Sequence, residues 1–525
     1  MTRVSRPRTT LLRAPLPLWL ASLLAAVGGG VFVVSFPAPG IWSLAFVAIA
    51  CSLISLIGRS AGGAMLVGSL FGAAFYFPHI RWVGGFLGDN ELSWVPWVAL
   101  AGVETVFMGA GAILISLAYR WVHRIVRTPI PRVLSTASVV AGLWSMREII
   151  MGSWPFGGFP WGRVGMGQAE SPLASAASWV GVDGLGFLIV LSVALFIEAV
   201  RLIAHRRNTR KWWALAAPSA VLIMTILVPQ FPTHSIGTFR VVAVQGNGPT
   251  AYIDQRGRYD VLDAQLQASS AALDAGADLI AWPEGGVGLD PRRDDKAAQV
   301  LSSVVQVTGA PILLNAAADR GDDTYNMSML WTADGATQTH SKRNPVPFGE
   351  YVPHREVFEK IVPSLIGMIG REYTPGTDSP TMAVGDTTIG LAICFDVLYD
   401  SLVHESITDG AEALIFQTNN ADFRGSEENL QQLEFARMRA IETGRSVVNV
   451  STVGTSEVIA PDGETLEQIG VDTAGAIVRD IDLRTGQTPA VWAGAWIRAL
   501  LLGGSLAALV VFGVLGVRFR RSLEA

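Results

Sequence analysis

Residues 238–246 read TFRVVAVQG, and the character of the 525-residue chain changes at this stretch. A short apolar run followed by a polar turn is typical of a buried β-strand. Long apolar runs precede it. Short apolar segments that alternate with amphipathic ones follow it, among them ADLIAWPE (277–284), PILLNAA (311–317) and TTIGLAICFD (387–396). The stretch therefore predicts the boundary between a membrane part and an α/β part.

The composition excludes several classes of protein. Half of the residues are hydrophobic, 16% are charged, and the formal net charge is −5. Ordinary soluble domains carry about 25% charged residues. A disordered, collagen-like or nucleic-acid-binding chain is therefore not expected. The two cysteines, Cys51 and Cys394, exclude a disulfide framework.

Eight apolar runs approach or exceed the roughly 20 residues that cross a bilayer as a helix. They lie at 16–36, 41–57, 61–78, 94–119, 133–150, 184–204, 212–229 and 494–517. This pattern predicts a polytopic α-helical membrane domain with about eight transmembrane helices.

Basic residues gather in every second loop, which predicts the orientation because positive charge is retained in the cytoplasm. The basic clusters lie at 3–13, 59, 120–132, 201–211 and 518–521. Both termini are then cytoplasmic and the large segment after the seventh run is extracytoplasmic. The N-terminus also fits a signal peptide, whose cleavage would not change that side.

We accordingly expect three units. Residues 1–230 form a membrane domain with seven helices, residues 231–490 an extracytoplasmic catalytic domain, and residues 491–525 a last transmembrane helix with a basic cytoplasmic tail. Within 231–490, alternating strands and helices predict an α/β layer arrangement, and about 250 residues suffice to bury a core.

Three reactive residues end or follow predicted strands, where α/β sheets present side chains to a cleft. They are Glu284 in AWPEGG, Lys342 in HSKRNPVPFGEY and Cys394 in AICFD. A carboxylate can take the thiol proton during attack, and an ammonium can stabilise an oxyanion. The backbone N–H of Phe395, directly after the cysteine, could be a second oxyanion donor. Each residue alone is a weak signal, and the combination is more specific.

At these positions the chain resembles the nitrilase superfamily, whose hallmark is a Glu–Lys–Cys triad, and nearly its whole length resembles the apolipoprotein N-acyltransferase family. The motifs are VVAVQGN (241–247), AWPE (281–284), KRNPVPFGEYVP (342–353), ICFD (393–396) and FARMRAIETGRSVVNVSTVG (435–454). The resemblance implies Glu284 as general base, Lys342 as transition-state stabiliser and Cys394 as nucleophile. It also implies Glu350 as a supporting carboxylate and an αββα sandwich for residues 238–490. Asp396 stands where the family usually has Glu.

The resemblance further implies a bacterial plasma-membrane enzyme of lipoprotein biosynthesis. Such an enzyme moves an acyl chain from a phospholipid, through a thioester, to the diacylglyceryl-cysteine of an apolipoprotein. It would contact membrane lipids, bind no nucleic acid and need no metal or organic cofactor. The histidines His340, His354 and His404 have no recognised metal-ligand spacing.

Two segments and three other functions are weighed at this point. The aromatic, Gly-rich segment 151–183 is either an interfacial anchor or the lining of a lipid-accessible cleft, and 352–376 is either a lid or a packed surface helix. A membrane-tethered amidase or nitrile hydrolase would carry the same triad, with water in place of the amine. A scaffold with a degenerate domain, or a transporter, is disfavoured by the intact triad and by the absence of a visible transporter repeat.

Overall fold

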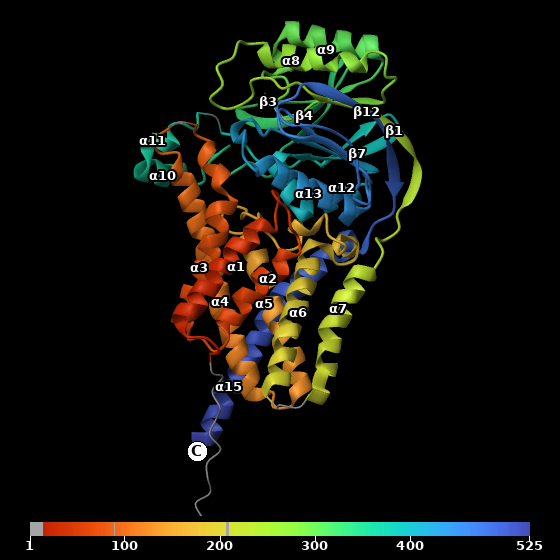
Figure 1. Ribbon diagram of the computed structural model, residues 1–525. Coiled ribbons are helices and arrows are strands. Elements are labelled where there is room, and N and C mark those ends of the chain that lie inside the picture. The colour runs from red at the N-terminus through yellow and green to blue at the C-terminus, as the bar shows by residue number, and fades with distance from the viewer. Residues whose placement is uncertain (1–13, 89, 206–208, 371, 525) are drawn as a thin grey trace, which may run out of the picture.

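The computed structural model describes residues 14–88, 90–205, 209–370 and 372–524. Figure 1 shows a bundle of long helices at one end of the molecule and a sheet-containing domain at the other. The basic cluster noted at 3–13 lies outside the described residues, which begin at Ala14.

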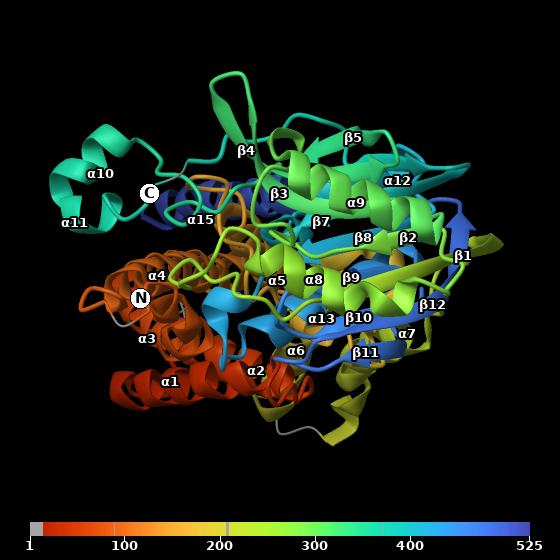
Figure 2. The same ribbon diagram turned by 90° about the horizontal axis from the view of Figure 1, so that it is seen from above.

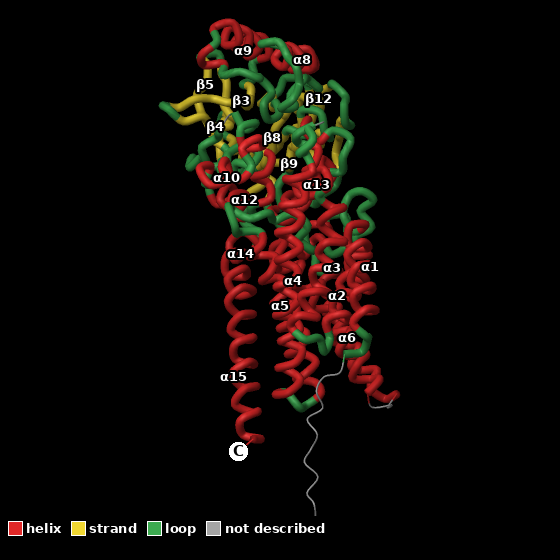
Figure 3. Tube along the Cα trace, turned by 90° about the vertical axis from the view of Figure 1, so that its left-hand side faces the viewer, coloured by secondary structure: helices red, strands yellow, loops and turns green. Residues whose placement is uncertain are grey.

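Each of the eight apolar runs contains most of a helix or helix pair. The helices are α1 (Leu18–Val34), α2 (Leu44–Leu56), α3 (Ala61–His79), α4 (Trp94–Ile125), α5 (Pro129–Met151), α6 (Ala177–His205), α7 (Ala216–Leu227), α14 (Pro489–Ala499) and α15 (Ser505–Glu524). Among the described residues, five helical segments are long and apolar enough to cross a membrane, and three shorter apolar helices accompany them. A π-helical turn at Leu500–Gly504 joins α14 to α15, so the two form one rod that descends along the bundle (Figure 3).

The second domain contains two six-stranded sheets. The first has the order β12-β1-β2-β3-β4-β5, and the second has the order β11-β10-β9-β8-β7-β6. The strands are β1 (His234–Gln245), β2 (Leu279–Ala281), β3 (Ile312–Arg320), β4 (Asp323–Thr332), β5 (Gly335–Ser341), β6 (Thr381–Val384), β7 (Thr387–Ile393), β8 (Ala413–Thr418), β9 (Val447–Ser451), β10 (Ser456–Ile459), β11 (Thr465–Ile469) and β12 (Gly475–Thr485). Three neighbours are parallel in each sheet, β1–β2–β3 and β7–β8–β9.

The two sheets pack face to face between two layers of helices. Their shared core contains Val241, Leu279, Leu391 and Ile415, which are all buried. Helices α8 (Asp260–Ala268) and α9 (Asp295–Thr308) cover the outer face of the first sheet, and α12 (Asp400–Thr408) and α13 (Glu428–Thr443) lie between the second sheet and the bundle (Figure 1). This arrangement confirms the predicted αββα sandwich.

The segment after α5 is exposed at Trp154 and Phe156 and buried from residue 161 to residue 169. It folds into short 3-10 turns at Met166–Gln168 and Ala174–Ala176, packed between the bundle and α13. The Trp161 side chain is 2% exposed and donates a hydrogen bond to Gln431 on α13. Trp161 therefore does not act as an interfacial anchor, because the catalytic domain covers its ring, whereas Trp154 of the same segment is 63% exposed.

The segment 352–376 contains two short helices, α10 (Arg355–Ile361) and α11 (Pro363–Ile366). Figure 2 shows them projecting to one side of the sheets. Val357 and Ile361 on α10 are exposed.

Candidate active site

The predicted residues meet where strands from both sheets end. Glu284 follows the parallel strand β2, and Cys394 comes directly after the parallel strand β7 of the facing sheet. Lys342 follows β5, and its backbone N–H donates to the carbonyl of Asn326 on β4. Because the sheets pack face to face, these chain ends come together at one edge of the sandwich.

Lys342 is the centre of the polar contacts. Its side chain is 1% exposed, and its Nζ lies 3.1 Å from Glu284 Oε1 and 2.9 Å from Glu350 Oε2. Two carboxylates therefore hold one ammonium in place, and that ammonium has a third donor position for a substrate oxygen. Glu350, for which the family resemblance implies a supporting role, contacts the lysine directly.

Asn326 on β4 binds the same two carboxylates. Its Nδ2 donates to Glu284 Oε1 at 2.7 Å and to Glu350 Oε1 at 3.0 Å. Asn315 on β3 donates to Asn326 Oδ1 at 2.9 Å, which fixes the direction of the amide. Asn326 was not predicted as a site residue, although a polar residue within the apolar stretch TYNMSMLW was a usable signal.

Cys394 has an unusual backbone conformation. Its φ is +49°, a left-handed value that costs free energy for a residue with a side chain. It opens a single 3-10 turn, Cys394–Leu398, which turns the chain sharply away from β7. The Sγ atom accepts a hydrogen bond from Gln432 Nε2 on α13 at 3.4 Å. The sharp turn therefore holds the sulfur at the end of the strand.

The electrostatics of the site keep the thiol protonated at rest. Burial and the nearby Glu284 carboxylate raise the pKa of Cys394 well above its ordinary value, and Lys342 offsets this only in part. Burial also raises the pKa of Glu284, against the lowering effect of Lys342. For Lys342, burial would lower the pKa, but Glu284 and Glu350 raise it well above its ordinary value. The lysine is thus a fixed cation, and the thiol must lose its proton during attack.

Asp396 ties the cysteine turn to the lysine loop. Its buried carboxylate accepts hydrogen bonds from the backbone N–H groups of Arg343 and Asn344, at 3.2 and 2.9 Å, and from Asn344 Nδ2 at 2.8 Å. These donors directly follow Lys342. The aspartate, although one methylene shorter than the glutamate usual in the family, therefore still joins the cysteine turn to the lysine loop. The Phe395 ring stacks on Phe159 of the helical domain, with 6.1 Å between the ring centroids.

A further buried carboxyl group, which was not predicted from the sequence, lies behind the cysteine. Glu428 is one helical turn before Gln432 on α13, and Asn420 Nδ2 donates to both side chains, at 2.7 and 2.8 Å. Burial raises the pKa of Glu428 to about 8, although the bond from Asn420 lowers it. Both residues follow a helical spacing that the sequence shows, but the side of α13 that faces Cys394 is set by tertiary packing.

Within the described ranges, no group of three or more His, Cys, Asp or Glu side chains is arranged to hold a metal ion. The chemistry of the site is that of a nucleophile, a carboxyl group and a fixed cation.

Two family models match the chain in agreement with the two domains. The model of the apolipoprotein N-acyltransferase N-terminal domain matches residues 28–195, and that of carbon–nitrogen hydrolases matches residues 241–489. A solved structure of a mutant Nesterenkonia AN1 amidase from the nitrilase superfamily is 18% identical, covers 50% of this chain and 96% of that chain, and has a TM-score of 0.37. The two family models thus define a membrane-bound member of the carbon–nitrogen hydrolase class.

Relatives of full length specify the family. The apolipoprotein N-acyltransferase of Mycolicibacterium smegmatis is 31% identical over 94% of this chain and 85% of its own length. That of Pseudomonas aeruginosa is 28% identical over 96% of this chain and 97% of its own. The chain belongs to the apolipoprotein N-acyltransferase family, and it is a bacterial membrane acyltransferase of lipoprotein biosynthesis.

Proposed function

We propose that the enzyme transfers a fatty acyl chain in two steps, through a thioester on Cys394. The donor is a membrane phospholipid, and the acceptor is the α-amino group of the diacylglyceryl-cysteine of an apolipoprotein. The observation that carries this proposal is the pair of contacts from Lys342 to Glu284 and Glu350, at the strand ends where Cys394 also lies.

In the first step, the Cys394 sulfur attacks an ester carbonyl carbon of the phospholipid, and Glu284 accepts the thiol proton. The raised pKa of Glu284 suits this role, because a general base works best when its pKa is near the operating pH. Lys342 and the backbone N–H of Phe395 stabilise the oxyanion. The ester C–O bond then breaks, and Glu284 returns the proton to the leaving lysophospholipid.

In the second step, the acceptor amine attacks the thioester carbonyl carbon. Glu284 takes a proton from the amine, the C–S bond breaks, and the thiol is restored as the amide forms. Covalent catalysis of this kind divides one difficult reaction into two easier ones and gives ping-pong kinetics. Glu350 supports both steps by holding Lys342, and Asp396 by holding the cysteine turn against the lysine loop.

We propose that residues 231–490 face the extracytoplasmic side, with 1–230 and 491–525 as the flanking membrane units and both termini in the cytoplasm. The alternation of basic loops supports this orientation. A site tethered at the bilayer avoids most of the cost of extracting an acyl chain, about 0.8 kcal/mol for each CH₂ group. The exposed apolar residues of α10 support a lid at 352–376 that contacts lipid.

The test uses the purified full-length protein and a phospholipid with a labelled acyl chain. We expect a hydroxylamine-sensitive label on the wild-type protein and on Cys51→Ser, which removes the other cysteine of the chain. Cys394→Ser should carry no thioester. A diacylglyceryl peptide with a free amine should then take the label as an amide, and a peptide with a blocked amine should not. Equal loss of label with both peptides, without an amide product, would instead identify a hydrolase.

A further inference from the structure

Two buried arginines hold the turn that carries Cys394 from behind. The carbonyl of Val397 accepts from Arg439 Nε at 2.9 Å. The carbonyl of Leu398 accepts from Arg439 Nη2 and from Arg163 Nη2, both at 3.0 Å. The last carbonyl groups of a helical turn have no partner within the turn itself. The two guanidinium groups therefore supply the partners that this turn lacks.

The two arginines come from different domains. Arg439 is on α13 of the catalytic domain, and Arg163 is in the segment between α5 and α6 of the helical domain. Arg163 also donates to both oxygens of Asp400, at 2.8 and 2.9 Å, where α12 begins. Arg439 Nη2 donates to the same carboxylate at 2.6 Å. A paired donation of this kind fixes direction as well as distance.

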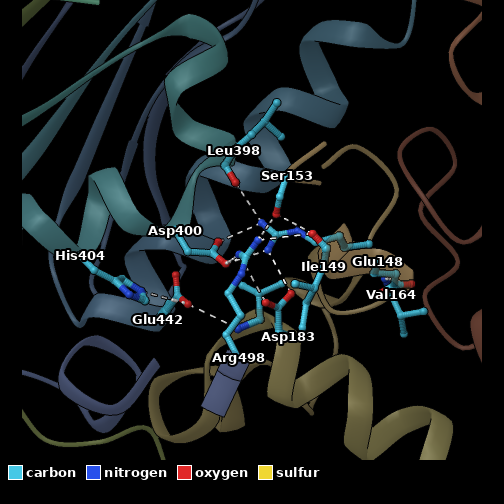
Figure 4. Close-up of polar contacts among 12 residues, drawn as sticks. Glu148, Ile149, Ser153, Val164, Asp183, Leu398, Asp400, His404, Glu442 and Arg498 are labelled. Atoms are coloured by element: carbon cyan, nitrogen blue, oxygen red, sulfur yellow. Dashed lines mark hydrogen bonds and ion pairs between the residues drawn. The ribbon is translucent and has the colours of Figure 1, made fainter. Parts of the chain in front are cut away.

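The contacts continue into the membrane helices. Asp183 on α6 accepts from Arg163 Nη1 at 3.2 Å, and Arg498 on α14 lies 3.6 Å from both Asp183 and Asp400. Figure 4 shows these side chains gathered at one place, with Asp400 and Leu398 contributed by the catalytic domain and Asp183 by the helical domain. Burial would raise the pKa of Asp400, but Arg163 and Arg439 hold it well below its ordinary value.

Buried ion pairs of this kind fix the positions of their side chains more than they raise the free energy of unfolding. Buried ion pairs are costly to desolvate, and removal of one partner leaves an uncompensated charge. Cys394 needs an imposed geometry, because its left-handed backbone persists only where the surroundings over-determine it. Asp396 fixes the front of the turn through the lysine loop, and the arginines fix its end at residues 397 and 398.

We infer that Arg163 is a positioning residue for the nucleophile, through which the helical domain fixes the turn of Cys394. The inference depends on the proposed role of Cys394. It means that the helical domain contributes to the geometry of the chemical step, in addition to its contact with lipid. The Arg163 side chain does not touch the reacting atoms, and it acts through the carbonyl of Leu398.

The test compares Arg163→Ala with Arg498→Ala in the full-length protein in detergent micelles. Both variants remove one cation that faces Asp183 and Asp400, but Arg498 makes no contact with the turn; its Nη2 instead binds Ser153 and Ile149. The rate of acyl-thioester formation on Cys394 is measured by mass spectrometry. We expect a fall of about 30–100-fold for Arg163→Ala, because small displacements of a reacting group cost about 10²-fold. The fall for Arg498→Ala should be less than about 3-fold.

A second readout separates positioning from folding. Added guanidinium chloride at low millimolar concentration should raise the rate of Arg163→Ala at least about 5-fold, and it should not affect Arg498→Ala. Arg163→Lys keeps the charge, but one ammonium cannot reproduce the planar fork toward Leu398 and Asp400. We expect it to be at least about 10-fold slower than wild type at an equal folded fraction.

The inference would be overturned if Arg163→Lys kept full activity. It would also be overturned if Arg163→Ala and Arg498→Ala lost activity equally at equal folded fractions. If Arg163→Ala does not fold, Arg163→Lys alone decides. A Cys394→Ala control distinguishes the two proposals. Acyl-thioester label on that variant would refute the role of Cys394, whereas label confined to Cys394 leaves the arginine comparison to test the inference alone.

Discussion

Replacement of Lys342 by methionine removes the cation that Glu284 and Glu350 share. Methionine has nearly the volume of the lysine stem, so the change removes a charge without opening a large cavity. The two carboxylates, each about 3 Å from the lost Nζ, then face each other in a site that is almost closed to water. We expect losses of both activity and stability, each with its own dependence on pH.

The magnitudes follow from the contacts. Loss of one oxyanion donor costs about 10²–10³-fold in rate, and acyl-thioester formation should fall by at least that factor. Removal of one partner of a buried ion pair costs about 3–5 kcal/mol. The pKa of Glu284 is already raised, and without the lysine it rises further. A raised carboxyl pKa means that the folded state binds the proton more tightly than the unfolded chain. The destabilisation should therefore increase with pH above the unfolded pKa of about 4.5.

The assay measures acyl-thioester formation and thermal unfolding of Lys342→Met at pH 6 and pH 8. Lys296→Met is the matched control, because it makes the same substitution at an exposed position on α9, on the outer face of the first sheet. We expect the control to keep the wild-type rate and the wild-type dependence of stability on pH, and Lys342→Met to lose more stability at pH 8 than at pH 6. A rate change of less than about 3-fold would contradict the role of Lys342, and a greater loss of stability at pH 6 would contradict the pKa reasoning.

Three further variants test the surroundings of the nucleophile. Gln432→Leu removes the hydrogen bond to Cys394 Sγ, so the pKa of the thiol should rise and iodoacetamide should react about 10-fold more slowly at fixed pH; an unchanged alkylation profile would exclude this contact. Asp396→Asn keeps the shape but weakens the acceptors for three N–H donors, and we expect acyl-thioester formation to fall by about 10-fold, with little effect on lipid KM. Glu428 has a pKa of about 8 in the folded state, so wild type should lose stability as pH rises from about 4.5 to about 8. Glu428→Gln removes this carboxyl group and should abolish that loss. Glu427→Gln, at the exposed neighbouring position, should leave the dependence of stability on pH unchanged.

Much of the fold could be predicted because its signals are local. Long apolar runs and short apolar strands are visible in the sequence without any knowledge of partners. The strands that were not predicted are β5, β6, β11 and β12. Among them, β12 reads GAIVRDIDLRT, in which the charged residues Arg479 and Asp480 lie between the buried Ile477 and Ile481 and interrupt the apolar pattern. It is an edge strand that becomes ordered by antiparallel pairing with β1, from Gln245 opposite Gly475 to His234 opposite Thr485. A partner more than 200 residues away cannot be read from local hydropathy.

The candidate site divides in the same way. Glu284 and Cys394 follow the apolar strands β2 and β7, so their positions could be predicted from the chain. Lys342 follows the polar strand β5, GATQTHS, so local hydropathy does not mark its position, and the motif KRNPVPFGEYVP does. Asn326, Gln432 and Arg163 could not be predicted, because their roles depend on which side chain packs opposite. The pKa of Cys394 also differs from the simple expectation. A nearby ammonium favours a thiolate, but burial and Glu284 outweigh Lys342 and keep the thiol protonated.

A protonated, half-buried thiol suits an enzyme that must transfer an acyl group to an amine and not to water. The Glu–Lys–Cys arrangement alone does not select between these acceptors, since either can attack a thioester. Selection requires that water be kept from the thioester while the lipoprotein binds. In this chain, Phe159 of the helical domain stacks on Phe395, next to the nucleophile, and on Trp161 at 5.7 Å. The apolar surface at this side of the turn thus comes from the helical domain. The same segment supplies Arg163, so one stretch of the helical domain both donates a hydrogen bond to the end of the turn and packs on its aromatic side chain.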